Sequence, residues 1–261
     1  MLRSNDFGES DRILHLLTPA TGRLTVIAKG ARRSVKRFGG NLDFFNQLRV
    51  QIERRRPTSM ARLELAKLER TYHGLREDPG RFAIGCYLLE LLDRLAPEGG
   101  PPAERERLYR FGISALGWID GATPDARMRV LLQLRTLDAV GLRPELARCV
   151  SCGAALGPAD GPRVPFRVGE GGAACRGCRA PDEVGYAVGI GTLRALDTSL
   201  GFSIDRLDRI ALGPDAIAEA QGLLRRFLGF HVGLELRSEG FLDQLTLRGP
   251  EGKLRPPPTQ A

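Results

Sequence analysis

Two Cys-x2-Cys pairs form the strongest chemical pattern in this sequence. They are Cys149 with Cys152 and Cys175 with Cys178, and 22 residues separate the pairs. Each pair can present two thiolates to one point, and two pairs complete the tetrahedron of sulfur ligands that suits Zn²⁺. Two buried disulfides or unrelated free thiols are the alternative, although a doubled Cys-x2-Cys is more specific for a metal than a single one. Because four protein ligands close such a site, we expect a structural metal rather than a catalytic one.

The residues between the two cysteine pairs support this interpretation. Val164, Phe166 and Val168 alternate with arginine and proline, which predicts a strand. The glycine-rich stretch 169–172 then predicts a tight reversal toward the second pair. This is the layout of a zinc ribbon or finger, which we place at residues 148–185.

A basic segment is the second candidate site. Residues 29–37 hold five cations and no acid, and three consecutive arginines close a later strand. If both segments fall on one side of the domain, they form a cationic groove that binds phosphates strongly and with marked salt dependence. An ordinary solvated loop is the alternative. The candidate contacts are Lys29, Arg32, Arg33, Lys36, Arg37, Arg54, Arg55 and Arg56.

Three phenylalanines lie near the basic segment, where an aromatic ring can stack on an unpaired base. At least one of Phe44 and Phe45 is expected in the core. Phe38, between Arg37 and Gly39, is the better candidate for stacking.

The elements around the basic segment predict a small β domain at residues 1–76. Apolar runs or alternations at 13–17, 24–28, 48–52 and 63–68 indicate short strands joined by glycine-containing turns. Such a set suggests a closed barrel of the OB type. Residues 1–75 hold 15 Lys+Arg against 7 Asp+Glu, and the remainder holds 24 against 24, so the whole excess of +8 lies in this domain. A localised positive excess indicates a polyanionic partner.

The rest of the chain has helical periodicity. Helices are expected at 78–95, 104–119, 190–200, 215–232 and 239–245, and between Thr123 as N-cap and Gly141. They define a helical domain at 77–147 and 186–247 into which the zinc module is inserted. Residues 185–191 are expected to be a loop into a helix, and the proline-rich tail 248–261 is expected to be disordered.

The sequence lacks the motifs of several protein classes. There is no phosphate-binding glycine loop and no apparent Ser-His-Asp set, so we expect a protein that is not an enzyme. His15 is expected in the core or at its rim, and Cys86 as a small buried residue. No apolar run is long enough to span a membrane, and no secretory signal is present, so we expect no membrane association. Cysteines in metal spacing favour a reducing, cytoplasmic location.

Two separate sets of residues resemble the bacterial recombination-mediator family RecO. The first comprises residues 8–13, 28–33 and 37–42, and the second comprises residues 142–146 leading into the first cysteine pair. The similarity extends over residues 1–248. In one respect the chain departs from the family, whose members usually carry further residues before Leu2. We therefore expect either a misassigned start or a barrel with a truncated first strand.

The resemblance implies an N-terminal OB-fold followed by a helical bundle that carries a zinc finger. It implies binding of single- and double-stranded DNA, annealing of complementary strands without ATP, and help in loading RecA onto DNA coated by single-stranded DNA-binding protein. The implied partners are RecR and the acidic C-terminal tail of the coating protein, and the implied location is the cytoplasm, in association with the nucleoid. Arg127, Arg129 and Arg135 could receive that tail, with plain helix surface as the alternative.

Two other functions are compatible with the residues themselves. An RNA-binding or ribosome-associated module can also combine an OB-fold with a structural zinc, because charge alone does not separate RNA from DNA. A metal-dependent nuclease would need an open metal position or clustered acids beside the basic face, and the sequence indicates neither.

Overall fold

The computed structural model describes residues 1–54, 56, 58–180 and 185–245. The chain forms two compact units, Met1–Thr123 and Pro124–Ala261. Each unit has its own core. Within the described part of the chain, no helix is both long and apolar enough to cross a membrane.

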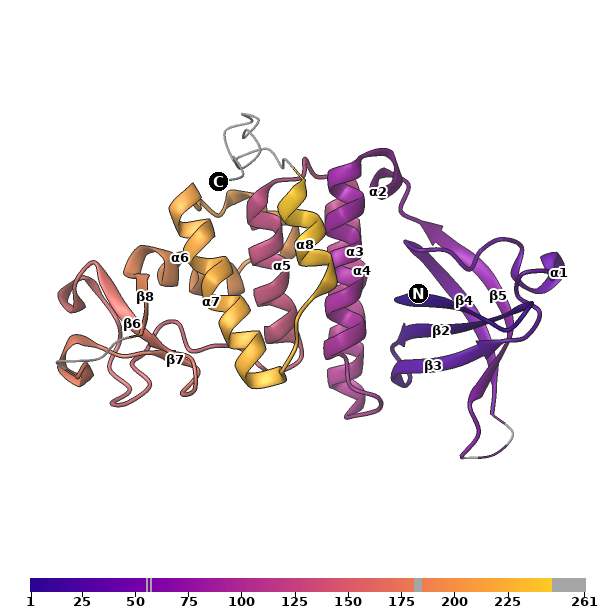
Figure 1. Ribbon diagram of the computed structural model, residues 1–261, viewed down its shortest axis with the longest axis horizontal. Coiled ribbons are helices and arrows are strands. Elements are labelled where there is room, and N and C mark those ends of the chain that lie inside the picture. The colour runs from indigo at the N-terminus through magenta and orange to yellow at the C-terminus, as the bar shows by residue number, and fades with distance from the viewer. Residues whose placement is uncertain (55, 57, 181–184, 246–261) are drawn as a thin grey trace. The chain divides into compact units, whose positions relative to one another are not determined.

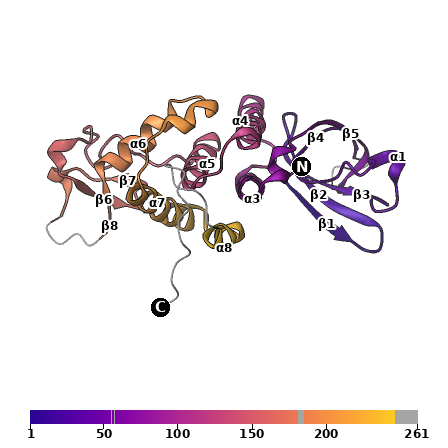
Figure 2. The same ribbon diagram turned by 90° about the horizontal axis from the view of Figure 1, so that it is seen from above.

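The first unit contains a five-stranded sheet in the order β1-β2-β3-β5-β4. Neighbouring strands are antiparallel except β3 and β5, which run parallel with Val26 opposite Ala61. The strands curl around a shared interior, with β4 and β5 opposite β1 and β2 (Figure 2). This topology confirms the predicted OB-type barrel. The bounds are Arg3–Phe7 (β1), Asp11–Thr18 (β2), Gly22–Ala28 (β3), Asn46–Glu53 (β4) and Ala61–Thr71 (β5).

Alternating side chains fill the barrel, as the sequence predicts. Leu14 of β2, Val26 of β3 and Leu63 of β5 are fully buried, while Arg49 on β4 faces solvent. The connection between β3 and β4 adds to this core through the short helix α1, Val35–Phe38.

The prediction that Phe38 stacks on bases is wrong, because its ring is only 2% exposed and packs in the barrel core. Phe45 is also buried, which confirms that at least one of the two neighbouring phenylalanines is a core residue.

Three helices complete the first unit: α2 (Gly74–Glu77), α3 (Pro79–Leu95) and α4 (Pro102–Gly121). The start of α3 is as predicted, because the Asp78 side chain accepts a hydrogen bond of 2.9 Å from the backbone N–H of Arg81. His15 of β2 lies at the barrel rim, with its Nδ1 2.5 Å from Oδ1 of the buried Asp93 on α3. Phe82 of α3 is 41% exposed.

Gly85 on α3 offers a test of this packing. A Cβ at Gly85 would lie 2.5 Å from Cδ2 of Leu75 and 2.7 Å from Cε1 of Phe45, whereas one at Gly117 on α4 meets only Tyr72 at 3.9 Å. Gly85→Ala should therefore destabilise the protein by about 1–3 kcal/mol through overpacking. Gly117→Ala, the matched control, should be neutral or stabilising by up to about 1 kcal/mol, because alanine favours helix. Urea unfolding measures both, and equal effects would contradict the packing described here.

The second unit contains four α-helices within the described residues (Figure 1). The predicted N-cap of α5 is wrong: Asp125, not Thr123, accepts hydrogen bonds from the N–H groups of Arg127 and Met128. Three short 3₁₀ helices, η1 to η3, lie between the longer elements. The bounds are Ala126–Ala139 (α5), Ile190–Leu200 (α6), Pro214–Val232 (α7), Arg237–Gln244 (α8), Pro158–Asp160 (η1), Arg176–Cys178 (η2) and Ile204–Arg209 (η3).

A three-stranded antiparallel sheet lies beside these helices, in the order β7-β6-β8. The strands are Arg163–Arg167 (β6), Gly172–Ala173 (β7) and Tyr186–Gly189 (β8). The predicted strand and glycine reversal of the zinc module correspond to β6 and the turn before β7. The predicted loop at 185–191 is wrong, because β8 pairs with β6 there and leads directly into α6.

The two compact units divide the chain after Thr123, whereas the sequence places a domain boundary at residue 76. The difference arises because α2, α3 and α4 pack with the barrel rather than with the later helices. The predicted tail 248–261 lies outside the described residues.

Candidate metal centre and nucleic-acid interface

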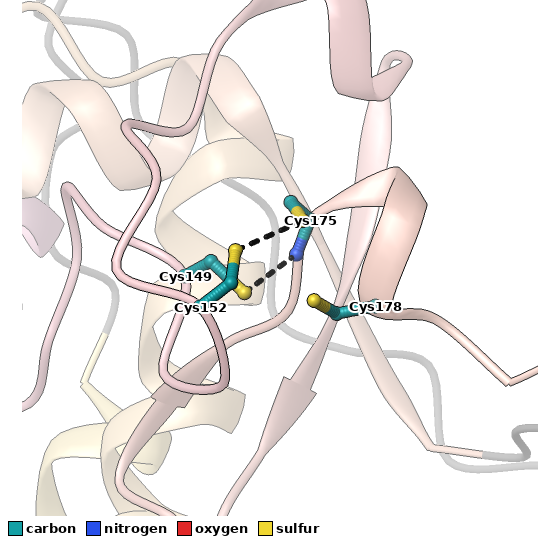
Figure 3. Close-up of side chains that lie close together, drawn as sticks. All are labelled: Cys149, Cys152, Cys175 and Cys178. Atoms are coloured by element: carbon teal, nitrogen blue, oxygen red, sulfur yellow. Dashed lines mark hydrogen bonds between the residues drawn. The ribbon is translucent and has the colours of Figure 1, made fainter.

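The four predicted ligands, Cys149, Cys152, Cys175 and Cys178, come together. All four sulfur atoms lie within 4.8 Å of one another (Figure 3). The Sγ atoms of Cys152 and Cys175 are 3.7 Å apart. A tetrahedral ion with metal–sulfur bonds of about 2.3 Å needs sulfur atoms about 3.8 Å apart. The cluster therefore has the size and the donor set of a four-thiolate metal site.

Backbone hydrogen bonds hold each cysteine pair in a tight turn. Gly153, at φ 74°, donates its N–H to the carbonyl of Cys149 at 2.9 Å, and Cys178 donates to the carbonyl of Cys175 at 3.1 Å. The guanidinium of Arg167 on β6 links the two turns, because it donates to Ser151 Oγ at 2.7 Å and to the Cys178 carbonyl at 2.9 Å. The sheet thus positions both halves of the site.

The thiols have unequal acidities. Burial disfavours the thiolate of Cys149, but N–H groups of Cys175, Cys152 and Ser151 point at its sulfur and together lower its pKa to about 6. Hydrogen bonds from the Cys178 thiol to Cys152 and Cys175, together with the charge of Cys149, raise the pKa of Cys178 to about 12. The protein alone thus favours one thiolate, and a bound divalent cation would favour the others.

Cys86, on α3, is partly buried and separate from this cluster. Burial raises the pKa of its thiol to about 11. The thiol therefore stays neutral near pH 7, and Cys86, which was expected to be buried, is only partly so.

The basic segment lies in the β3–β4 connection, beside the hairpin of β1 and β2. Asp11, at the start of β2, holds the two together. Its Oδ1 accepts the N–H of Gly30 at 2.7 Å, and its Oδ2 lies 3.1 Å from Nζ of Lys29. The carbonyl of Ser10 also accepts the N–H of Arg32 at 3.0 Å. The segment is therefore an anchored loop with defined positions for its cations.

The five cations of this loop have different partners. Lys29 pairs with Asp11, and Arg32 lies 3.8 Å from Asp6. Arg37 supports the loop itself, since its side chain donates to the Lys29 carbonyl and to Ser34 Oγ and its guanidinium lies over the Phe38 ring. Two cations remain: Arg33 and Lys36 are exposed and form no ion pair with the described residues.

The second cationic run does not join this loop. β5 runs parallel to β3 and begins opposite Val26, so the residues before Ala61 lie toward the start of β3, whereas the basic loop leaves its end. Arg54 accordingly lines a groove with Pro19 and Thr21 of the β2–β3 turn. The hairpin of β4 and β5 extends away from α1 (Figure 1).

The expected single groove is therefore not formed by these two segments. Arg54 and Arg56 are both exposed, and Arg55 lies outside the described residues.

The three arginines proposed to receive an acidic tail have internal partners instead. Arg129 is 4% exposed and lies 3.2 Å from Glu239 and 2.5 Å from Asp243 of α8. Arg127 binds Asp125 and two backbone carbonyls, and Arg135 donates to three carbonyls at and after the end of α6. The prediction of a docking site there is wrong, because these side chains already join elements of the second unit.

Asp11 provides a test of the anchored loop. The N–H of Gly30 and then the Lys29 ammonium hold the pKa of Asp11 below its ordinary value of 3.8. A depressed folded-state pKa means that the carboxylate stabilises the loop above pH 3.8 and that this contribution is lost as the pH falls through the folded value. We expect Asp11→Ala to accelerate amide exchange at Gly30 several-fold at neutral pH, as measured by NMR. Unchanged protection would exclude the anchor.

One exposed aromatic near the loop was missed by the sequence analysis. Phe7, the last residue of β1, is 52% exposed and lies opposite Asp11. Its position in a run of polar residues, Asn5 to Ser10, was the available signal.

Two family models together cover most of the chain and meet near residue 75. The family model "Recombination protein O N terminal" matches residues 1–72, and "Recombination protein O C terminal" matches residues 76–240. Similar curated proteins include "DNA repair protein RecO" of Anaeromyxobacter sp. (strain K), 35% identical over 94% of each chain. The proteins of the same name from Geobacter sulfurreducens and Myxococcus xanthus are also 35% identical, over 94% and 95% of this chain and 96% of each relative. The chain therefore belongs to the recombination protein O (RecO) family of DNA repair proteins.

Proposed function

We propose that this chain binds single- and double-stranded DNA through its basic loop and anneals complementary strands as a mediator of recombination in DNA repair. The observation that carries this proposal is the pair of exposed cations, Arg33 and Lys36, on a loop fixed by Asp11. Cations without carboxylate partners are free to replace the counterions of phosphates, and counterion release drives binding. Membership of a DNA repair family makes DNA the expected polyanion.

The mechanism of annealing is electrostatic. Two complementary strands repel each other through their phosphates, and a cationic surface that neutralises the phosphates leaves the base edges free to pair. Such a process needs neither ATP nor a catalytic group, which agrees with our expectation that the protein is not an enzyme.

The metal of the four-cysteine site is proposed to be Zn²⁺. Four thiolates at tetrahedral spacing suit this ion. Because they would fill all four coordination positions of the ion, none would be left for a substrate or a reactive water. The ion would brace the two cysteine turns and the small sheet. Cys149, Cys152, Cys175 and Cys178 would hold it.

Membership of the RecO family supports a finer role. We propose that the chain assists the loading of RecA onto DNA coated by single-stranded DNA-binding protein, and that RecR and the tail of that coating protein are its partners. No docking surface is assigned for either partner, since Arg127, Arg129 and Arg135 have internal roles.

The decisive experiment is strand annealing with DNA that is already coated by the cognate single-stranded DNA-binding protein. We expect the chain to accelerate annealing in the absence of ATP, with no shortening of labelled DNA in Mg²⁺. Competition with RNA of the same sequence separates this proposal from an RNA-binding module. Preferential RNA binding, or DNA cleavage, would contradict it.

A further inference from the structure

Phe7 occupies an unusual position for an apolar side chain. It ends β1, is 52% exposed and pairs in register with Asp11 of β2. Residues paired across antiparallel strands project from the same face. Because Leu14 and Leu16 of β2 fill the barrel, the odd-numbered Asp11 and its partner Phe7 project outward.

The same outer face carries the first cation of the basic loop. Ala28 of β3 is buried, so the next residue, Lys29, projects outward, where its Nζ lies 3.1 Å from Asp11 Oδ2. Phe7, Asp11 and Lys29 therefore form a row across three neighbouring chain segments. Two strand spacings, about 10 Å, separate the backbone at Phe7 from the backbone at Lys29.

The hairpin end that carries Phe7 is held in place relative to the loop. Asp11 accepts the Gly30 N–H, the Ser10 carbonyl accepts the Arg32 N–H, and Arg12 Nε lies 3.1 Å from Asp6 Oδ1. These contacts join the hairpin tip that carries Phe7 to the loop that carries Arg33 and Lys36. The hairpin that carries the exposed ring is thus anchored to a loop whose Arg33 and Lys36 form no ion pair with the described residues.

We propose that Phe7 stacks on an unpaired base of a single strand whose phosphates the basic loop holds. The proposal rests on the proposed DNA-binding function and adds a contact that distinguishes single strands from duplexes. Every base has a stacking face, so the contact tolerates any sequence, but a paired and stacked base cannot offer that face. The contact would hold bases apart from their neighbours along the strand and accessible to a complementary strand.

The other aromatic residues near the loop fit this role less well. Phe38 and Phe45 are buried, and Phe44 is half-buried. Phe82 is exposed but belongs to α3, where its ring packs edge-on against Phe45 at 5.4 Å between centroids. Phe7 has no ring contact of this kind among the described residues.

The test compares Phe7→Ala and Phe7→Tyr with the unaltered protein. Fluorescence anisotropy of labelled DNA would measure the affinity of each protein for three ligands. These are a single-stranded oligothymidine, a strand of the same length whose sugars carry no bases, and a duplex. Phe230→Ala is the matched control, because Phe230 is also an exposed phenylalanine, 66% exposed, but belongs to the second unit.

We expect Phe7→Ala to weaken binding to oligothymidine by between about fivefold and a hundredfold. Affinity for the duplex and for the strand without bases should stay within about twofold, and so should all affinities of the control. Phe7→Tyr should retain binding, because tyrosine keeps the ring. The salt dependence should not change, because no charge is removed.

Equal losses on all three ligands would overturn the stacking role, as would an unchanged affinity for oligothymidine. If Phe7→Ala binds normally while reversal of Arg33 and Lys36 abolishes binding, the stacking proposal fails and the DNA-binding function stands. If the unaltered protein binds no DNA, the proposed function itself fails.

Discussion

The double substitution Arg33→Glu/Lys36→Glu is expected to weaken DNA binding by on the order of tenfold or more at low salt and to stop strand annealing. Both side chains are exposed and have no ion pair among the described residues, so their charges are available to phosphates. Loss of two contacts should also reduce the slope of log affinity against log salt by about 1.4 on single strands. Titrations at several NaCl concentrations and an annealing assay with complementary oligonucleotides measure these effects.

Arg33 and Lys36 are better targets than Lys29 and Arg32. Glutamate at position 29 or 32 would face Asp11 or Asp6 and would disturb the anchored loop as well as the DNA contact. The control is Arg143→Glu/Arg194→Glu, which makes the same change in net charge in the second unit, at two exposed arginines that form no ion pair among the described residues. Equal loss of annealing in both double variants would indicate a general effect of charge and would reject this loop as the site.

Removal of the proposed zinc is expected to unfold the described part of the zinc module, residues 148–180 and 185, within the second unit. Zinc binding to a structural site contributes about 10–16 kcal/mol of apparent free energy at neutral pH. The core around the two cysteine turns is small, because it consists of Cys149, Ala174 and Cys175 with Leu156 and Cys178 packed against them. Cys175→Ser should reduce bound zinc, measured by elemental analysis, to about a tenth or less of the unaltered protein. Protease digestion should then cut the module rapidly.

Cys86→Ala is the matched control for this loss, because Cys86 lies in the first unit, outside the cluster. It should retain its zinc and its resistance to protease. A module that stays protected after chelation would show that packing alone stabilises it. Zinc bound at full stoichiometry by Cys175→Ser would remove that residue from the ligand set.

Local patterns in the sequence predict much of this structure. Alternation identifies the strands from β2 to β6, and Asp78-Pro79 marks the start of α3, because these features depend on neighbours along the chain. The metal site is equally local in origin, since each Cys-x2-Cys pair makes its own turn. Only the pairing of the two halves depends on the intervening sheet.

Long-range pairing decides what the sequence does not predict. From the sequence alone, Arg129 is a residue on the surface of a helix. In the fold, α8 places Asp243, more than 100 positions later in the chain, beside it. Phe38 stands between Arg37 and Gly39, and only the curled sheet buries it. The parallel pairing of β3 with β5 likewise separates Arg54 from the basic loop. Charge counts identify the basic domain, whereas the acids that neutralise individual cations become known only from the fold.

The parallel pairing of Val26 with Ala61 also bears on how the barrel folds. β3 and β5 cannot meet until the whole stretch between them, including the basic loop and the β4 hairpin, has closed on itself. The entropy of closing such a stretch rises only slowly with its length, by about 0.6 kcal/mol for each doubling. Insertions between these strands should therefore cost the domain little stability, so the basic loop can be lengthened without compromising assembly of the barrel.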